Sequence, residues 1–161
     1  MILALARLGL RSSELVSLEL DDIDWGAGKI RVRGKNGQRN DLPLPADVGE
    51  AVANYLRKSR PRNANRRVFL RDKAPICGFK GPSGLGSIIR RSLKRAGIDS
   101  PKKGTHQFRH GLASEMLRGG ASLGEIGQVL GHRYVQTTAI YAKVDLDALR
   151  TLALPWPGEA Q

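Results

Sequence analysis

The sequence is poor in cysteine, in long apolar runs and in acidic residues, and each shortage excludes a class of protein. Its 161 residues include one cysteine, Cys77, so neither an intrachain disulfide nor a cysteine-based zinc cluster can form. Arg, Glu or Gly interrupts the apolar runs after a few residues, which excludes a membrane span. The apolar residues 1–10 lack the charged start of a signal peptide. A cytoplasmic protein in a reducing environment is therefore expected.

Acidic residues are outnumbered, with 15 Asp and Glu against 27 Lys and Arg. The formal net charge is +12 and the isoelectric point is near 10.6. A basic surface gains affinity for phosphates by releasing their counterions, so nucleic acid is the first candidate partner and an anionic membrane the second. No predicted helix joins a cationic face to a face rich in Trp or Phe, which disfavours the membrane. Solubility alone is the simplest alternative explanation of the charge.

Composition and length are those of one folded domain. Charged residues make up 26% of the chain and the residues AVILMFWYC 40%, without a polar low-complexity tract, which argues against a disordered chain. A chain of 161 residues is long enough to bury a core without metal or disulfide support. We therefore expect a single domain over residues 1–161, with no internal linker or repeat.

Apolar spacing and turn residues predict a mostly α-helical fold with one small antiparallel sheet, an α+β arrangement. A helical stretch over residues 2–20 is interrupted near Gly9, and Ser12 or Ser13 is available to cap its second part. Alternating polar and apolar residues predict a hairpin of two strands, at 29–33 and 40–44. Further helices are predicted at 47–58 (with Asp47 in a capping box), 87–96, 105–118, 122–131, 136–143 and 145–154, with a short strand at 68–70 and a loop at 78–86.

A set of residues that suit phosphate chemistry recurs along the chain in a specific order. One arginine starts a predicted helix, a lysine lies in the hairpin turn, a His-x-x-Arg pair shares one helix face, and a Gly-His pair is followed by a tyrosine. In chain order these residues are Arg11, Lys35, His106, Arg109, His132 and Tyr141, with Glu14 one helical turn after Arg11.

This order, in the settings Gly-Leu-Arg-Ser-Ser-Glu-Leu, His-Gln-Phe-Arg-His and Leu-Gly-His, resembles the catalytic domain of the tyrosine recombinases, also called the phage integrase family. The resemblance covers residues 8–149. It implies a mainly helical enzyme that cuts and rejoins double-stranded DNA through a covalent phosphotyrosine, with no metal or nucleotide cofactor. It also implies a homo-oligomer, a tetramer on DNA, and a nucleoid-associated protein of bacterial, phage or mobile-element origin. The helical core-binding domain that usually precedes this domain is expected to be absent, because Met1 lies shortly before Arg11.

Phosphate charge explains four of these residues. In the transition state negative charge spreads over the non-bridging oxygens, and two arginines, Arg11 and Arg109, would hold those oxygens through bidentate hydrogen bonds. His132 would donate a further hydrogen bond to one of them. Glu14 would orient or charge-balance Arg11.

Proton transfer explains the other three. Tyr141, whose unperturbed pKa is about 10, is a poor nucleophile at neutral pH and must lose its proton during attack. His106 is the expected proton acceptor. The leaving 5′ oxygen must gain a proton, and Lys35 on the hairpin turn would be the general acid.

Each residue alone has a simpler explanation. Arg11 and Glu14 would ordinarily form a surface ion pair, Lys35 would be a solvated lysine, and Tyr141 a half-buried core residue. The rival function is a noncatalytic regulator, because residues 122–131 and 134–141 resemble a helix-turn-helix. An inactive truncated integrase remnant is the other alternative.

A zinc enzyme is disfavoured. His106 and His110 lie four residues apart, but Gln107 stands where a His-Glu-x-x-His site needs glutamate, and His132 is the single further candidate ligand. The glycines at 81–86 lack the Gly-Lys-Ser/Thr ending of a phosphate-binding loop.

Overall fold

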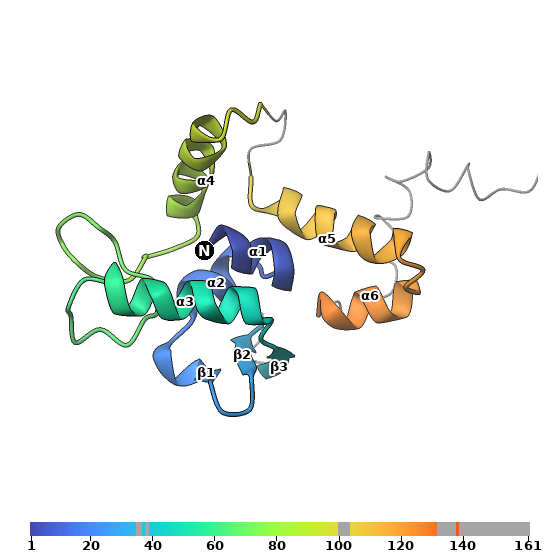
Figure 1. Ribbon diagram of the computed structural model, residues 1–161, viewed down its shortest axis with the longest axis horizontal. Helices are drawn as coiled ribbons and strands as arrows, with labels where there is room; N and C mark the ends of the chain where they lie inside the picture. The colour runs from blue at the N-terminus through green and yellow to red at the C-terminus, as the bar shows by residue number, and fades with distance from the viewer. Residues whose placement is uncertain (35–36, 38, 100–103, 132–137, 139–161) are drawn as a thin grey trace, which may run out of the picture.

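The computed structural model describes residues 1–34, 37, 39–99, 104–131 and 138. In these ranges the chain is mainly helical with one small sheet, as the sequence predicts (Figure 1). The elements in chain order are α1 (Ile2–Leu8), α2 (Ser12–Ser17), the 3-10 helix η1 (Leu20–Asp22), β1 (Ile23–Asp24), β2 (Lys29–Arg33), β3 (Arg39–Pro43), α3 (Ala46–Lys58), α4 (Ser83–Arg95), α5 (His106–Arg118) and α6 (Leu123–Val129).

The sheet has three antiparallel strands in the order β1-β2-β3. In β2 buried and exposed residues alternate, which turns Ile30 and Val32 toward the core and leaves the basic residues of the strand in water. Ile30 pairs with Leu42 and Val32 with Asn40 across the hairpin. The register therefore sets which side chains of β3 lie near the core.

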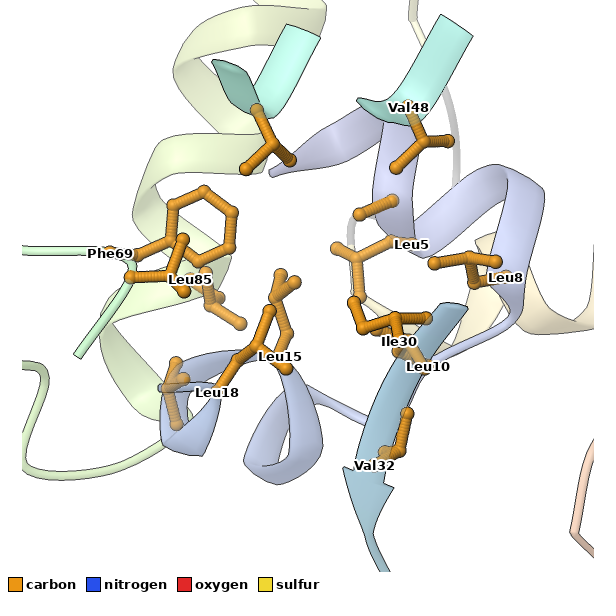
Figure 2. Packing of buried hydrophobic residues seen from close by; sticks show 14 of the residues in the cluster. Leu5, Leu8, Leu10, Leu15, Leu18, Ile30, Val32, Val48, Phe69 and Leu85 are labelled. Carbon is orange, nitrogen blue, oxygen red and sulfur yellow. The ribbon is translucent and has the colours of Figure 1, made fainter. Parts of the chain in front are cut away.

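The main core forms where α1, α2 and the sheet meet. Leu5, Leu8 and Leu15 are almost completely buried, and Figure 2 shows them converging with Ile30 and Val32 of β2. Figure 1 shows α1 near the middle of the molecule, and it packs against α2, α3 and α5. The N-terminal helix is therefore the central scaffold element of the described fold.

A second, smaller core joins α5 and α6 through Ala113, Ile126 and Leu130. Thr138 is fully buried, and a Cβ atom built on Gly127 would lie 3.0 Å from its hydroxyl oxygen. Position 138 therefore packs against α6.

Gly9 ends α1 and lets this second core approach the first. Its φ of 58° is left-handed, a conformation that glycine adopts without steric cost. A Cβ at this position would lie 2.7 Å from Leu130 Cδ2 and 2.9 Å from Leu112 Cδ2. Gly9 thus serves both the helix end and the close contact with α5 and α6.

Several predicted boundaries were wrong. Arg11, not Ser12 or Ser13, is the N-cap of α2, and Pro45 is the N-cap of α3, so Asp47 lies in the first turn and not at the cap. The second strand of the hairpin is shifted one residue earlier, to Arg39–Pro43.

The predicted loop at 78–86 was wrong in its second half, since α4 begins at Ser83, directly after Pro82. Proline suits a helix start because it has no amide proton to leave unpaired there. Gly84 fits because a Cβ would lie 2.9 Å from the ring of Phe79. Residues 68–70 form no strand, and Leu70 makes a single bridge to Gly78.

Apart from Thr138, the residues of the helices predicted at 136–143 and 145–154 lie outside the described residues. None of the helices within the described ranges is long and apolar enough to cross a lipid bilayer.

Candidate catalytic site

Arg11 and Glu14 form the first half of the site, at the start of α2. One carboxylate oxygen of Glu14 accepts a hydrogen bond from the Arg11 backbone N–H at 2.7 Å, and the other accepts one from the Arg11 guanidinium, also at 2.7 Å. The Glu14 side chain is 7% exposed and that of Arg11 36%. Because the carboxylate is buried and bonded on both sides, it holds the partly exposed guanidinium in a fixed direction.

Arg109 forms the second half and enters from α5. Its side chain is buried, and its two terminal nitrogens donate to backbone carbonyls, Nη1 to Gly9 at 2.6 Å and Nη2 to Leu130. Arg11 Nη2 donates to the next carbonyl, that of Gly131, at 3.3 Å. Two arginines from distant parts of the chain therefore meet at consecutive carbonyls that follow α6.

A small cleft lies between these groups. Arg11, Glu14 and Arg109 line it together with Gly34 at the end of β2 and Gly131 after α6. Gly34 and Gly131 are the chain neighbours of two further predicted residues, Lys35 and His132. Lys35, His132 and Tyr141 themselves lie outside the described residues.

Two ion pairs hold the end of β2 that lies next to the hairpin turn. Arg33 is the last residue of β2, and its Nη2 lies 3.0 Å from Glu19 Oε2 and 3.4 Å from Asp22 Oδ1. The negative charges of Asp22 and Glu19 raise the pKa of Arg33 above its ordinary value. The end of β2 that leads toward residue 35 is thus joined to η1 and to its N-cap residue.

His106 is the first residue of α5 and is exposed. The preceding residue, Thr105, makes a hydroxyl–hydroxyl hydrogen bond with Ser12, which follows Arg11. The start of α5 and the start of α2 are therefore joined beside the site. The predicted set is brought together at Arg11, Glu14 and Arg109, with His106 at the adjoining helix end.

Sequence reasoning missed the other polar groups here. The carbonyls of Gly9, Leu130 and Gly131 accept the arginine hydrogen bonds, and the Asn40 amide on β3 lines the cleft. Backbone carbonyls carry no sequence signal. The two glycines do carry one, because Gly9 and Gly131 both adopt a positive φ, and a Cβ there would lie 2.7 Å from Leu130 and 3.3 Å from Asn40, respectively. Within the described ranges, no three His, Cys, Asp or Glu side chains lie close enough to hold a metal ion.

A basic surface lies on α4, away from this cleft. The helix exposes four cations in its C-terminal half: Arg90, Arg91, Lys94 and Arg95. Three of them border a groove of about 1040 Å³ that Arg71, Lys73 and Lys80 border as well. In Figure 1 α4 stands on the opposite side of the molecule from the sheet. The net positive charge is thus partly gathered on one helix.

A family model described as the phage integrase family matches residues 1–147. The chain belongs to the phage integrase family. Among curated relatives of this integrase-family chain, the integrase/recombinase y4rA of Sinorhizobium fredii is 88% identical over the whole chain, which corresponds to 39% of that protein. Tyrosine recombinase XerD of Mycobacterium tuberculosis is 34% identical over 155 residues, 93% of this chain and 48% of XerD. The chain thus spans less than half the length of these two relatives.

Solved structures agree with this membership. The crystal structure of XerA recombinase superposes with a TM-score of 0.79 at 31% identity, over 92% of this chain and 54% of XerA. XerH site-specific recombinase, in a post-cleavage complex with its palindromic difH substrate, gives a TM-score of 0.77 at 26% identity, over 96% of this chain and 44% of XerH. The fold of this integrase-family chain is that of a tyrosine recombinase catalytic domain.

Proposed function

We propose that this chain is the catalytic domain of a site-specific DNA recombinase, in which Tyr141 attacks the scissile phosphate and forms a 3′-phosphotyrosyl intermediate. The observation that supports this most directly is the meeting of Arg11 and Arg109 at the consecutive carbonyls of Leu130 and Gly131. Two permanent cations beside one narrow cleft suit the two non-bridging oxygens of a phosphodiester.

The proposed cleavage step conserves atoms and charge without a cofactor. The Tyr141 oxygen forms a bond to phosphorus, and the bond between phosphorus and the 5′ oxygen breaks. The tyrosine proton goes to His106, and Lys35 gives a proton to the leaving 5′ oxygen. Religation is the reverse attack by a 5′ hydroxyl of the exchanged strand. The phosphotyrosine retains the bond energy, so no nucleotide is hydrolysed.

Two further residues serve the phosphate in this scheme. His132 donates a hydrogen bond to a non-bridging oxygen, and its neighbour Gly131 already lies in the cleft. Glu14 keeps Arg11 aimed, because it bonds both the guanidinium and the backbone of that arginine. Removing Arg11 or removing Glu14 is therefore expected to lower adduct formation to a similar extent.

Double-stranded DNA is the proposed substrate, and a homo-oligomer, a tetramer on DNA, the proposed assembly. The net charge of +12 and the cations on α4 suit a polyanion. XerH, whose fold this chain shares, was solved with its difH substrate. Strand exchange between two duplexes needs a nucleophile for each of four strands, which a tetramer supplies.

Neutralising α4 is expected to weaken DNA binding in a salt-dependent way. The double variant Arg91→Gln/Lys94→Gln removes two exposed cations, so the slope of log affinity against log salt falls in magnitude by about 2. Fluorescence anisotropy with a labelled duplex at several salt concentrations measures this. Arg57→Gln/Lys58→Gln at the end of α3 is the matched control, and its slope is expected to stay unchanged. Equal slopes in all three proteins would remove α4 from the DNA interface.

Covalent capture of DNA tests the proposed function. The chain is incubated in EDTA with a pool of nicked duplexes whose sequence is randomised around the nick, so that the short cleaved fragment diffuses away and traps the intermediate. A protein–DNA adduct that survives a denaturing gel is the expected result. DNA binding without an adduct would instead favour the helix-turn-helix regulator or the inactive remnant.

A further inference from the structure

A hydrogen bond joins the hydroxyl groups of Ser12 and Thr105, which are 93 residues apart in the chain. Ser12 is the first residue of α2 and directly follows Arg11. Thr105 is the N-cap of α5 and directly precedes His106. The bond therefore connects the chain neighbours of two residues that the proposed mechanism uses for different tasks.

The Thr105 hydroxyl is not used in the way usual for a helix cap. A threonine at an N-cap ordinarily accepts a hydrogen bond from an amide of the first helical turn. Ser122, at the start of α6, does so with the Glu125 amide. Thr105 makes no such cap bond and has helical φ and ψ of −64° and −28°. Its hydroxyl is committed to another helix instead of its own.

Other contacts hold α5 further along the helix. Arg109 anchors the helix one turn later, through the carbonyls of Gly9 and Leu130. His106 is exposed, and among the described residues no hydrogen bond to its ring is formed. Its place relative to Arg11 therefore depends on where the start of α5 lies, and the bond between Ser12 and Thr105 joins that start to the start of α2.

We propose that Ser12 and Thr105 are positioning residues that keep His106 in register with Arg11 at the scissile phosphate. This inference rests on the proposed function, since it assigns the bond a role in proton transfer from the nucleophile. Neither hydroxyl touches the reacting atoms. Their effect on the reaction passes through His106.

Single variants that remove one hydroxyl test this role. Ser12→Ala and Thr105→Val are each expected to slow adduct formation about 10-fold or more at saturating DNA, because small displacements of a catalytic group carry penalties of this size. DNA affinity and melting temperature are expected to stay close to those of the parent chain. Thr105→Ser retains the hydroxyl and should restore the rate. Ser13→Ala, on the exposed neighbour, is the matched control and should leave the rate unchanged.

Two combinations separate positioning from general support of the fold. The double variant Ser12→Ala/Thr105→Val is expected to be no slower than either single variant, because both remove the same bond. In a His106→Ala background, Ser12→Ala is expected to have no further effect on the rate. A full additional loss in that background would overturn the inference, as would single variants that cleave at the parent rate or that lose DNA binding in step with the rate.

The failure of this inference is distinct from the failure of the proposed function. A parent chain that binds DNA but forms no adduct overturns the proposed function, and the positioning role with it. A parent chain that forms the adduct, with variants that are indifferent to the hydroxyls, overturns the positioning role alone.

Discussion

Replacing Tyr141 by phenylalanine is expected to abolish the covalent adduct and to leave DNA affinity within about threefold of the parent chain. The substitution removes one oxygen atom, which is the proposed nucleophile of the phosphotyrosyl bond. Loss of a covalent nucleophile lowers enzyme rates by about 10⁴-fold or more, which puts the residual reaction below detection on a gel. The ring and the basic surface are retained, so binding should persist. A denaturing gel and an anisotropy titration on the same protein measure the two effects.

The chain offers a matched control for this experiment. It contains three tyrosines, and Tyr134→Phe makes the same chemical change shortly before the proposed nucleophile. Tyr55 is a poorer control because its hydroxyl accepts a hydrogen bond from the Leu70 amide at 3.2 Å. Adduct formation by Tyr134→Phe at the parent rate is expected. An adduct that persists in Tyr141→Phe and disappears in Tyr134→Phe would move the nucleophile to Tyr134.

The elements that the sequence predicted well are those in which local and global preferences agree. The alternation in Lys29-Ile-Arg-Val-Arg33 matched β2 residue for residue, because one face of that strand packs on the core. The Ser122 and Glu125 capping box marked the start of α6 correctly for the same kind of local reason. β1 was missed since two residues are too short for any periodicity to show.

The errors occurred where tertiary contacts override local signals. Two serines suggested a cap for α2, yet Arg11 takes the cap position, since Glu14 bonds its backbone and its side chain together. Ser12 bonds another helix instead. Glycines at 81–86 suggested a loop, but Gly84 lies in α4, where a Cβ would meet the ring of Phe79 at 2.9 Å. Such contacts connect residues far apart in the chain and leave no pattern within a sequence window.

The candidate site was predictable in its residues but not in its connections. Order and spacing brought out Arg11, Glu14 and Arg109. That the guanidinium of Arg109 binds Gly9 and Leu130 carbonyls was not visible, because every residue has a carbonyl. The structure gives this arginine a second task beside the proposed phosphate contact. It holds α1, α5 and the end of α6 together.

Arg109→Lys is therefore expected to lower stability as well as activity. A lysine ammonium is a compact charge and cannot span the carbonyls of Gly9 and Leu130 as a planar guanidinium does. One buried carbonyl loses a charged hydrogen bond, which costs about 1.5–3 kcal/mol. At about 2–4 °C per kcal/mol for a chain of this size, the melting temperature should fall by about 3–12 °C. Thermal unfolding followed by circular dichroism measures this, and the adduct should be lost in the capture assay.

Arg11→Lys is the matched comparison, because it makes the same change at the other arginine of the cleft. The Arg11 side chain is 36% exposed, and a lysine there still faces the Glu14 carboxylate. Its bond to the Gly131 carbonyl is long, at 3.3 Å, so little stability depends on it. We expect Arg11→Lys to melt within about 2 °C of the parent chain and still to lose most adduct formation. If Arg109→Lys also melts within about 2 °C of the parent chain, the carbonyl bonds of Arg109 contribute no stability. The role of Arg109 would then be limited to the phosphate contact.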